Sequence, residues 1–342
     1  MIAGVTMILS RQLSVVIPSW NGEVLLRTCL PALARQTISG FEIIVVDNGS
    51  TDGSLGYLAV THPHVRCLCN PENRGFAPAA NQGIAAARGE YIALLNNDTE
   101  PAPDWLERLA ACMEREPGLF SVGSKMLCYR DRGRIDDAGT GYTILGVSFR
   151  YGDGLPDGPA WPSREVFTVC AGAALYRKDL LLALGGFEET FFAYVEDVDL
   201  GWRARRAGYR NWFCAESVVW HLGSASSGSR YNPFKIFLTN RNNLWLLRRN
   251  LPWWLWGLSL PVLAGLMLKA VFYAMHGREM AGACLRAVWA GVRQRPASAP
   301  VPGGADWRRD VAIWGWLWMM TVEWGVLRWR RRQLSLPGAA KS

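Results

Sequence analysis

The stretch Tyr91-Ile92-Ala93-Leu94-Leu95-Asn96-Asn97-Asp98-Thr99-Glu100 decides the fold predicted for this 342-residue chain. Its first five residues form a continuous apolar or small run, which is typical of a strand buried on both faces of a parallel sheet. The polar residues then follow at the carboxyl end of the strand, where open α/β sheets bind ligands. The oxygen groups of Asn96, Asn97 and Asp98 suit Mg²⁺ or Mn²⁺. An ordinary polar turn is the alternative, because Asn and Asp are also turn and cap residues.

Three more strands are predicted before this stretch, over Leu13–Ile17, Phe41–Val46 and Val65–Leu68. Helical patterns lie between them, and Phe76–Ala87 predicts a further helix before Tyr91. This alternation of strands and helices predicts a parallel sheet with helices on both faces. Polar strand ends rich in Asn, Asp, Ser and Gly should therefore meet at one edge of the sheet.

Four motifs in this region carry a resemblance to a known family. They are Val15–Asn21, Asp47–Gly53, Asn73–Phe76 and Leu94–Asp98. In order and spacing they resemble the nucleotide-sugar half of family 2 glycosyltransferases with the GT-A fold, and the rhamnosyltransferase-like branch is the most similar. The resemblance covers residues 11 to 245. It implies a Rossmann-like, mostly parallel sheet with helices on both faces.

The resemblance implies that the first half of the site binds a nucleotide diphosphate sugar. Asp47 would accept a hydrogen bond from a pyrimidine N–H, and the phosphates would lie before Phe76, where free N–H groups and the helix dipole favour negative charge. A plain turn at Asp47 and a solvated surface charge at Arg74 are the alternatives. The residues assigned to nucleotide-sugar binding are Pro18, Ser19, Asn21, Asp47, Asn73, Arg74, Gly75, Asn96 and Asn97.

A divalent metal site is also implied by the resemblance. Asn96-Asn97-Asp98 matches the family's Asp-x-Asp metal motif, with Asn96 at the first acidic position, so that Asp98 is the main carboxylate. Relatives carry a histidine metal ligand at the place of His221, which follows a predicted strand. This assignment requires His221 to fold back beside Asp98, and a purely structural histidine is the alternative. The expected cofactor is Mg²⁺ or Mn²⁺.

The catalytic acids are expected in the segment Phe191–Arg203, where aromatic residues lead into three carboxylates at the start of a helix. Acids in a first helical turn also favour the helix dipole, which is the structural alternative. A carboxyl group close to apolar rings and to another acid has a raised pKa that suits a general base. The resemblance implies that Asp197 deprotonates the acceptor with inversion and that Glu196 orients acceptor or base. Asp199 is expected to pair locally with Arg203.

The middle of the chain is less regular. Helix Asp104–Arg115 and strands Phe120–Met126 and Val166–Tyr176 are predicted, while residues 128–162 show no clear periodicity and are expected near the acceptor side. The serine-rich segment Ser224–Arg230 is either a lid over the diphosphate or a plain linker. The eight cysteines show no CxxC pair, which favours buried free thiols in a reduced compartment.

The carboxyl-terminal part differs in composition from the rest. From Arg241 onward Lys and Arg exceed Asp and Glu by 11, whereas the preceding part has a balance of −3, and 11 of the 17 tryptophans lie after residue 240. Basic charge combined with interfacial aromatics and aliphatic runs favours anionic membrane lipid, and no nucleic-acid partner is expected. Leu251–Leu268 and Val311–Leu327 are the expected membrane-surface or spanning segments. A helical subdomain packed on the catalytic core is the alternative.

The resemblance implies a GT-A catalytic domain over residues 11–240, with a nucleotide-sugar-binding half (11–100) and an acceptor and catalytic half (101–240), and the composition of the carboxyl-terminal part predicts a helical membrane-anchoring region over 241–335. The expected activity is a metal-dependent inverting transfer of rhamnose or another hexose from a dTDP- or UDP-sugar to a glycan or polyprenyl-linked acceptor in cell-envelope polysaccharide synthesis. The expected place is the cytoplasmic face of the cell inner membrane, since Met1–Gln12 lacks a secretory signal. A membrane-bound sugar-binding or scaffold protein with a degenerate site is the alternative.

Overall fold

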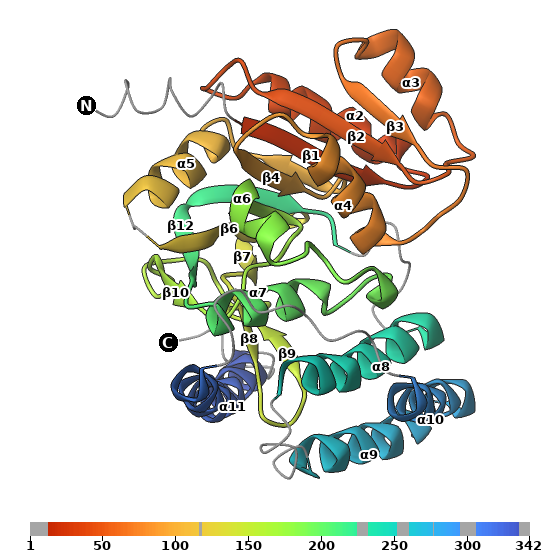
Figure 1. Ribbon diagram of the computed structural model, residues 1–342, viewed down its shortest axis with the longest axis vertical. Coiled ribbons are helices and arrows are strands. Elements are labelled where there is room, and N and C mark those ends of the chain that lie inside the picture. Colours follow the sequence, from red (N-terminus) through yellow and green to blue (C-terminus); the bar gives the residue numbers. More distant parts are fainter. Residues whose placement is uncertain are drawn as a thin grey trace.

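A ten-stranded sheet runs through the computed structural model (Figure 1), with the order β10-β12-β6-β11-β4-β1-β2-β3 and with β5 paired to β12 and β7 to β6. The structure describes residues 13–115, 118–223, 232–251, 260–275, 277–294 and 306–334. A separate small sheet pairs β8 with β9. The strands are β1 Leu13–Ser19, β2 Glu42–Asp47, β3 Arg66–Cys69, β4 Tyr91–Leu95, β5 Thr99–Pro101, β6 Leu119–Cys128, β7 Asp131–Asp137, β8 Thr140–Tyr142, β9 Ser148–Arg150, β10 Arg164–Val166, β11 Ala173–Arg177 and β12 Arg210–His221.

The amino-terminal half of the sheet is parallel, as the sequence predicted. β1 pairs with β2 and β4, and β2 pairs with β3, all in parallel register. Ser19 at the end of β1 lies opposite Asp47 at the end of β2. The polar residues after these strands therefore meet at one edge of the sheet.

The carboxyl-terminal half of the sheet is mixed, so the expectation of a mostly parallel sheet is wrong. β11 lies antiparallel to both β4 and β6, and β12 is parallel to β6 but antiparallel to β5 and β10. The prediction of a single strand over Val166–Tyr176 is also wrong, because β10 and β11 are separate strands. The two ends of this stretch pair with different neighbours, β10 with β12 and β11 with β4 and β6, so the chain must leave the sheet between them.

Helices cover both faces of the sheet because alternate strand residues point to opposite sides. Val16, Ile44 and Leu94 pack in one apolar cluster that includes α4, and Val15 and Leu95 pack in the other with α2 and α5. The helices of this part are α2 Glu23–Ala34, α3 Ser54–Thr61, α4 Phe76–Ala86, α5 Trp105–Arg115, α6 Lys178–Ala183 and α7 Glu196–Arg206, with the 3₁₀ turn η1 Glu189–Phe191.

Four further helices lie together at one end of the molecule (Figure 1): α8 Pro233–Asn250, α9 Leu260–Ala274, α10 Arg278–Arg293 and α11 Trp307–Leu334. α8 packs against α7, and α11 packs against α7 and β8, while α10 packs against α8 and α9. A buried ion pair of 2.8 Å joins Arg206 of α7 to Asp310 of α11. The described helices include none with the length and apolar content needed to cross a membrane.

Two sequence predictions fall partly or wholly outside the described residues. They are the serine-rich segment Ser224–Arg230 and residues 252–259 of the apolar stretch Leu251–Leu268.

The expectation of free thiols is wrong for one pair of cysteines. Cys112 on α5 and Cys214 on β12 form a disulfide, with their Cα atoms 6.6 Å apart. The pair lies together because α5 packs against β12. Sequence spacing could not show this, because 102 residues separate the two positions.

Candidate active site

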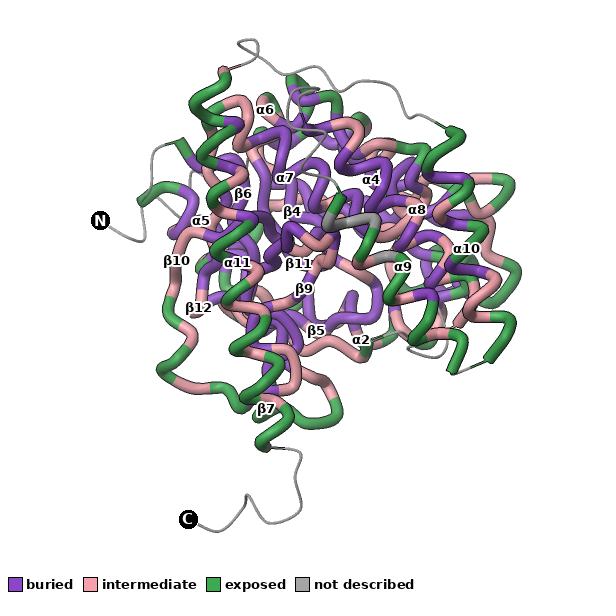
Figure 2. Tube along the Cα trace, turned by 90° about the horizontal axis from the view of Figure 1, so that it is seen from below, coloured by how far each residue is buried: buried purple, intermediate pink, exposed green. Residues whose placement is uncertain are grey.

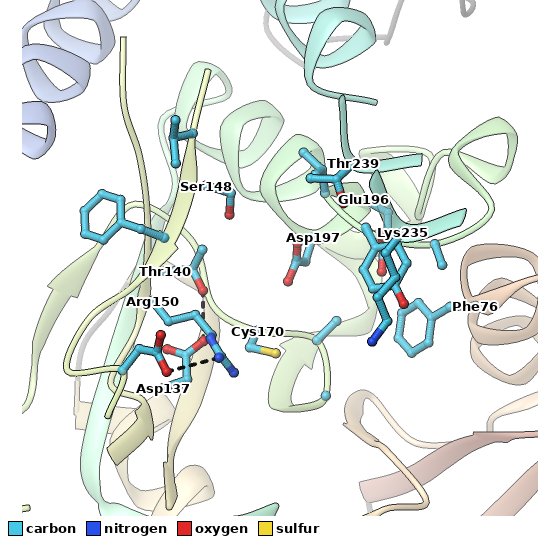
Figure 3. A pocket seen from close by; sticks show the side chains of 18 of the residues that line it. Phe76, Asp137, Thr140, Ser148, Arg150, Cys170, Glu196, Asp197, Lys235 and Thr239 are labelled. Carbon is cyan, nitrogen blue, oxygen red and sulfur yellow. Dashed lines mark hydrogen bonds and ion pairs between the residues drawn. The ribbon is translucent and has the colours of Figure 1, made fainter. Parts of the chain in front are cut away.

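A cleft of about 1940 Å³ opens between the polar strand ends and the carboxyl-terminal helices. Figure 3 shows Asp197 and Cys170 between Asp137 and Arg150 on one side and Lys235 and Phe76 on the other. Most sequence-predicted site residues line this cleft, whereas Asn21, Asp47 and Arg74 do not. Those that line it are Pro18, Ser19, Asn73, Gly75, Asn96, Asn97, Asp98, Glu196, Asp197 and His221.

Asp98 and His221 face each other inside the cleft. The antiparallel pairing of β12 with β5 sets His221 opposite Thr99, and the backbone N–H of Leu222 donates to the carbonyl of Asp98 at 3.0 Å. As a result, Nε2 of His221 lies 3.4 Å from Oδ1 of Asp98. The fold-back that the metal assignment required is therefore confirmed. Apart from His221, the buried Oδ1 of Asp98 has no hydrogen-bond partner among the described residues.

Asp136 orients the imidazole of His221 from the other side. Its Oδ2 lies 2.6 Å from Nδ1 of His221, and its Oδ1 accepts a 2.6 Å hydrogen bond from Arg150. β7 and β12 both pair with β6, which brings Asp136 and His221 together. Burial by itself lowers the pKa of His221, but hydrogen bonds and charge from Asp136 and Asp98 outweigh it and raise that pKa to about 9.

This donor set fits a divalent cation. Asp98 offers a buried carboxylate oxygen and His221 offers Nε2, while Asp136 holds the second ring nitrogen, as carboxylates do behind many metal-binding histidines. A cation would also replace the imidazolium proton as the positive charge between the two carboxylates. Sequence reasoning missed Asp136, whose only signal was an acidic pair inside the irregular segment 128–162.

Asn96 and Asn97 connect the end of β4 to neighbouring strands. The side-chain amide of Asn97 donates to Ser19 at 2.9 Å, and the backbone N–H of Asn96 donates to the carbonyl of Gly172 at 2.8 Å. A Cβ at Gly172 would lie 2.8 Å from the side chain of Asn96, so this close approach depends on glycine. These contacts fix the position of Asp98 at the edge of the sheet.

The loop before α4 is organised by Asn48, which sequence reasoning also missed. Its side-chain oxygen accepts from the backbone N–H of Arg74 at 3.2 Å, and its amide donates to Asn73 at 3.0 Å and to the carbonyl of Gly75 at 2.9 Å. The side chain of Arg74 itself is exposed. The signal for Asn48 was its place directly after Asp47 in a motif that the sequence singled out.

Asp47 and Asn21 support the same edge of the sheet. Asp47 is buried, its Oδ2 accepts from the backbone N–H of Ser50 at 3.0 Å, and its Oδ1 has no partner among the described residues. Asn21 accepts a 2.8 Å hydrogen bond from the backbone N–H of Thr51. Asn21 thus connects the loop after β1 to the loop after β2 through a hydrogen bond. Asp47 keeps its Oδ1 available as a hydrogen-bond acceptor.

Glu196 and Asp197 begin α7 and open into the cleft. Burial raises the pKa of both carboxyl groups, and the charge of Asp197 raises that of Glu196 further. Oδ1 of Asp197 accepts from the backbone N–H of Val198 at 2.8 Å, and Thr168 donates to the backbone carbonyl of Asp197 at 2.8 Å. Near neutral pH, Glu196 therefore keeps its proton more readily than Asp197. This difference suits a hydrogen-bond donor, Glu196, beside a general base, Asp197.

The loop before these acids has an unusual backbone. Phe192, Tyr194 and Val195 have φ values of 67°, 71° and 73°, and such left-handed conformations cost a non-glycine residue about 1–3 kcal/mol each. The loop also touches the turn before α4, where a Cβ at Gly75 would lie 2.5 Å from the carbonyl oxygen of Phe192. The side-chain amide of Asn242 on α8 holds this loop by donating to three of its carbonyl groups.

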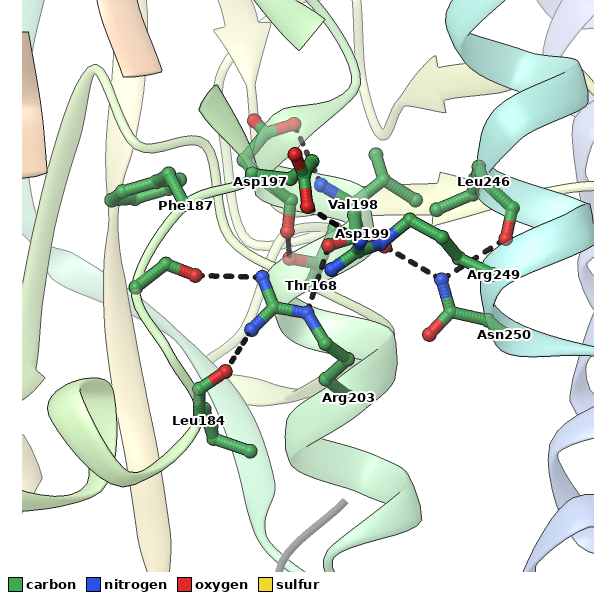
Figure 4. Close-up of polar contacts among 12 residues, drawn as sticks. Thr168, Leu184, Phe187, Asp197, Val198, Asp199, Arg203, Leu246, Arg249 and Asn250 are labelled. Atoms are coloured by element: carbon green, nitrogen blue, oxygen red, sulfur yellow. Dashed lines mark hydrogen bonds and ion pairs between the residues drawn. The ribbon is translucent and has the colours of Figure 1, made fainter. Parts of the chain in front are cut away.

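Asp199 has a structural role, as expected. Its Oδ2 accepts from Arg203 at 2.8 Å, which confirms the predicted local pair. Its Oδ1 accepts from Arg249 at 3.1 Å and from Asn250 at 2.7 Å, both on α8 (Figure 4). The third carboxylate of the motif therefore joins α7 to the carboxyl-terminal helices.

Comparison with known proteins places the chain in a family. The model described as "Glycosyl transferase family 2" matches residues 14–185. The chain is 32% identical over 180 residues to an uncharacterized glycosyltransferase, YibD of Escherichia coli, covering 51% of this chain and 50% of the relative. It is 27% identical over 286 residues to the N-acetylglucosaminyl-diphospho-decaprenol L-rhamnosyltransferase of Mycobacterium tuberculosis, covering 73% and 91%.

Some relatives are matched over only a small part of their own length. O-antigen biosynthesis protein RfbC of Myxococcus xanthus is 31% identical over 63% of this chain but only 18% of its own length. The matched part is half or less of the length of the first three curated relatives.

Solved structures share the fold at low sequence identity. GalNAc-T7 with UDP, GalNAc and Mn²⁺ superposes with a TM-score of 0.56 at 16% identity, covering 70% of this chain and 48% of that one. Residues 1–349 of TarS from S. aureus give a TM-score of 0.56 at 18% identity, covering 82% and 80%. These matches confirm a GT-A fold with helices on both faces of a mixed sheet. The chain belongs to glycosyl transferase family 2.

Proposed function

We propose that this protein is an inverting glycosyltransferase that moves a sugar from a nucleotide diphosphate sugar to an acceptor hydroxyl. One observation carries the proposal: the Asp98–His221 pair and the Glu196–Asp197 pair open into the same cleft. The first pair suits the diphosphate end of a donor, and the second suits an acceptor hydroxyl. Family membership and the fold shared with GalNAc-T7, which was solved with UDP and Mn²⁺, support it.

The chemistry follows from the placement of these groups. Asp197 takes the proton of the acceptor hydroxyl, because burial raises its pKa towards that of a useful base. The acceptor oxygen bonds to the anomeric carbon as the bond to the nucleoside diphosphate breaks, which inverts the configuration. Glu196 donates a hydrogen bond that orients the acceptor. Asp98 and His221 would hold Mg²⁺ or Mn²⁺, whose charge stabilises the leaving diphosphate.

The substrates are proposed from the names of relatives. A relative named as a rhamnosyltransferase acting on a diphospho-decaprenol acceptor supports dTDP-rhamnose as donor and a polyprenyl-linked glycan as acceptor. A structure of TarS in complex with UDP-GlcNAc, with a TM-score of 0.53, supports a UDP-sugar as the other donor. The O-antigen relative supports a place in cell-envelope polysaccharide synthesis.

The proposed location is the cytoplasmic face of the inner membrane. Large apolar side chains are exposed on α9, α10 and α11, among them Met267, Trp289 and Trp318, and arginines flank them on α10 and α11. Figure 2 views the molecule from the end where these helices lie and shows exposed segments on each of them. Such surfaces bind anionic lipid. Sedimentation with anionic vesicles, but not with neutral ones, would support this location, whereas binding to neither would contradict it.

Release of nucleoside diphosphate from a panel of UDP-, GDP- and dTDP-sugars tests the function. The protein is assayed with lipid extract and with Mn²⁺, Mg²⁺ or EDTA, beside Asp98→Ala, Asp197→Ala and the surface control Asp104→Ala. Release from one donor that is lost with EDTA and in both site variants, but kept in the control, supports the transferase. If donors raise the melting temperature without turnover, the protein binds sugar nucleotides and is not this enzyme.

A further inference from the structure

The cleft is larger than a single small-molecule site. Ligand pockets commonly span about 300–1,000 Å³, and this cleft has about 1940 Å³. Beyond the strand ends and α7, its far wall is formed by the β8–β9 hairpin and by α9 and α11. Neither the sequence motifs nor the proposed chemistry uses this wall, although it opens into the same cleft as Asp197.

Lys269 on α9 gives this wall an uncompensated charge. Its Nζ lies 3.5 Å from the carbonyl oxygen of Gly146 in the turn between β8 and β9, and no carboxylate of the described residues pairs with it. Burial lowers its pKa to about 8. A partly buried ammonium group with no carboxylate paired to it is costly, so an anion that enters the cleft at this point is stabilised.

Apolar side chains surround this cation and continue to the surface. Leu268 and Phe272 flank Lys269 on α9 and line the cleft, although 71% and 45% of their surface is exposed. Trp324 and Leu327 on α11 line the same wall. A cation inside and an apolar path leading out match a molecule with an anionic group and a hydrocarbon chain.

Arg328 adds a second positive charge at this wall. Its guanidinium group lies 4.9 Å from the ring centroid of Trp324, in a position that lines the cleft. It projects from α11, whereas Lys269 projects from α9. The two cations therefore come from the two helices that line this end of the cleft.

We propose that α9 and α11 form an acceptor subsite, in which Lys269 and Arg328 bind the phosphate groups of a lipid-linked sugar and Leu268 and Phe272 contact its hydrocarbon chain. The sugar then points towards Asp197 across the same cleft. This inference rests on the proposed transferase function and names the residues that receive its second substrate.

Calorimetric titration of the full chain with geranyl diphosphate, inorganic diphosphate and geraniol tests the subsite without any donor. We expect geranyl diphosphate to bind at least about tenfold more tightly than either fragment, and Lys269→Met to weaken it by about tenfold or more. Lys125→Met is the matched control, because Lys125 pairs with Asp157 outside the cleft and should leave binding unchanged. Arg328→Gln, at an exposed position, is a second variant that does not depend on a buried residue.

Three results would overturn the subsite. They are unchanged binding in both Lys269→Met and Arg328→Gln, equal binding of inorganic diphosphate and geranyl diphosphate, and displacement of geranyl diphosphate by UDP with Mn²⁺, which would place it in the donor half. A failed subsite leaves donor turnover in the panel unchanged. A failed transferase function instead shows as no donor turnover, whatever the titrations give, so the two failures are distinguishable.

Discussion

The side-chain amide of Asn242 donates a 2.8 Å hydrogen bond to the carbonyl oxygen of Tyr194, two residues before Glu196. The same amide donates to the carbonyl oxygens of Phe191 and Ala193 at 3.0 and 2.9 Å. A residue on α8, outside the segment matched by the family model, thus stabilises a loop with left-handed backbone. The direction in which Glu196 and Asp197 enter the cleft depends on this loop.

Asn242→Leu should therefore lower kcat more than it changes KM for the donor, because the carboxyl groups proposed as catalytic, Glu196 and Asp197, lose their fixed position. It should also lower the free energy of unfolding by about 1–3 kcal/mol, since buried carbonyl groups lose their donor. Urea denaturation and steady-state kinetics measure both. Asn243→Leu is the matched control: Asn243 is equally buried on the same helix, but its amide donates to Thr239 of α8. Equal loss of kcat in the two variants would exclude a specific role for Asn242.

Asp136→Asn should weaken the affinity for Mn²⁺ by about 10–100-fold, because His221 loses the carboxylate that orients its ring. Electron paramagnetic resonance of free Mn²⁺ during a titration measures this affinity without any enzyme assay. Asp131→Asn is the control, since Asp131 pairs with Arg134 on the exposed part of the same strand. If Asp136→Asn binds Mn²⁺ as tightly as the unmodified protein, Asp136 does not support a metal ligand.

The parallel half of the fold was predictable from the sequence because its signals are local. β1, β2 and β4 each contain a short apolar run followed by polar residues, and the predicted bounds differ from β1, β2, β3 and β4 by at most two residues at either end. The placement of His221 beside Asp98 depends on the antiparallel pairing of β12 with β5, and only the family resemblance suggested it. Local patterns contain no information on such pairings between distant strands.

The contributions of Asp136, Asn242 and Lys269 were not predictable for the same reason. Asp136 lies 85 residues from His221, and Asn242 lies 48 residues from Tyr194. Their side chains act through contacts made only in the folded chain. Residues 241–335 were expected to anchor the protein, with a helical subdomain packed on the rest of the chain as the alternative. α8 and α11 do pack directly on α7, and the anchoring stays a prediction.

The contribution of Glu196 to stability should fall as the pH rises above about 4.5, so the stability of Glu196→Gln should fall less with pH than that of the unmodified protein. The folded-state pKa of Glu196 is raised above its ordinary value of 4.5, by burial and then by the charge of Asp197. The folded protein therefore holds a proton that the unfolded chain releases, and its stability decreases with pH over that range. Melting temperatures between about pH 5 and pH 8 measure the slope. The exposed neighbour Glu189→Gln should keep the slope of the unmodified protein, and an unchanged slope in Glu196→Gln would contradict the raised pKa.

Asp199→Asn should lower the free energy of unfolding by about 3–5 kcal/mol, because it leaves two buried guanidinium groups without their shared carboxylate. Arg203 is 1% exposed and Arg249 is 5% exposed, and both donate to Asp199. Asp104→Asn is the matched control, since Asp104 pairs with Arg108 at the same i,i+4 spacing on an exposed helix surface, and its loss should change stability by about 0.5 kcal/mol or less.

The comparison separates two explanations of the acidic motif. If Asp199 served only as a first-turn acid that favours the helix dipole, both variants would lose about the same small amount, below about 1 kcal/mol. A large loss confined to Asp199→Asn would instead show that this carboxylate joins α7 to α8, and hence that the catalytic acids at the start of α7 depend on the carboxyl-terminal helices for their position. Urea denaturation followed by circular dichroism measures both free energies.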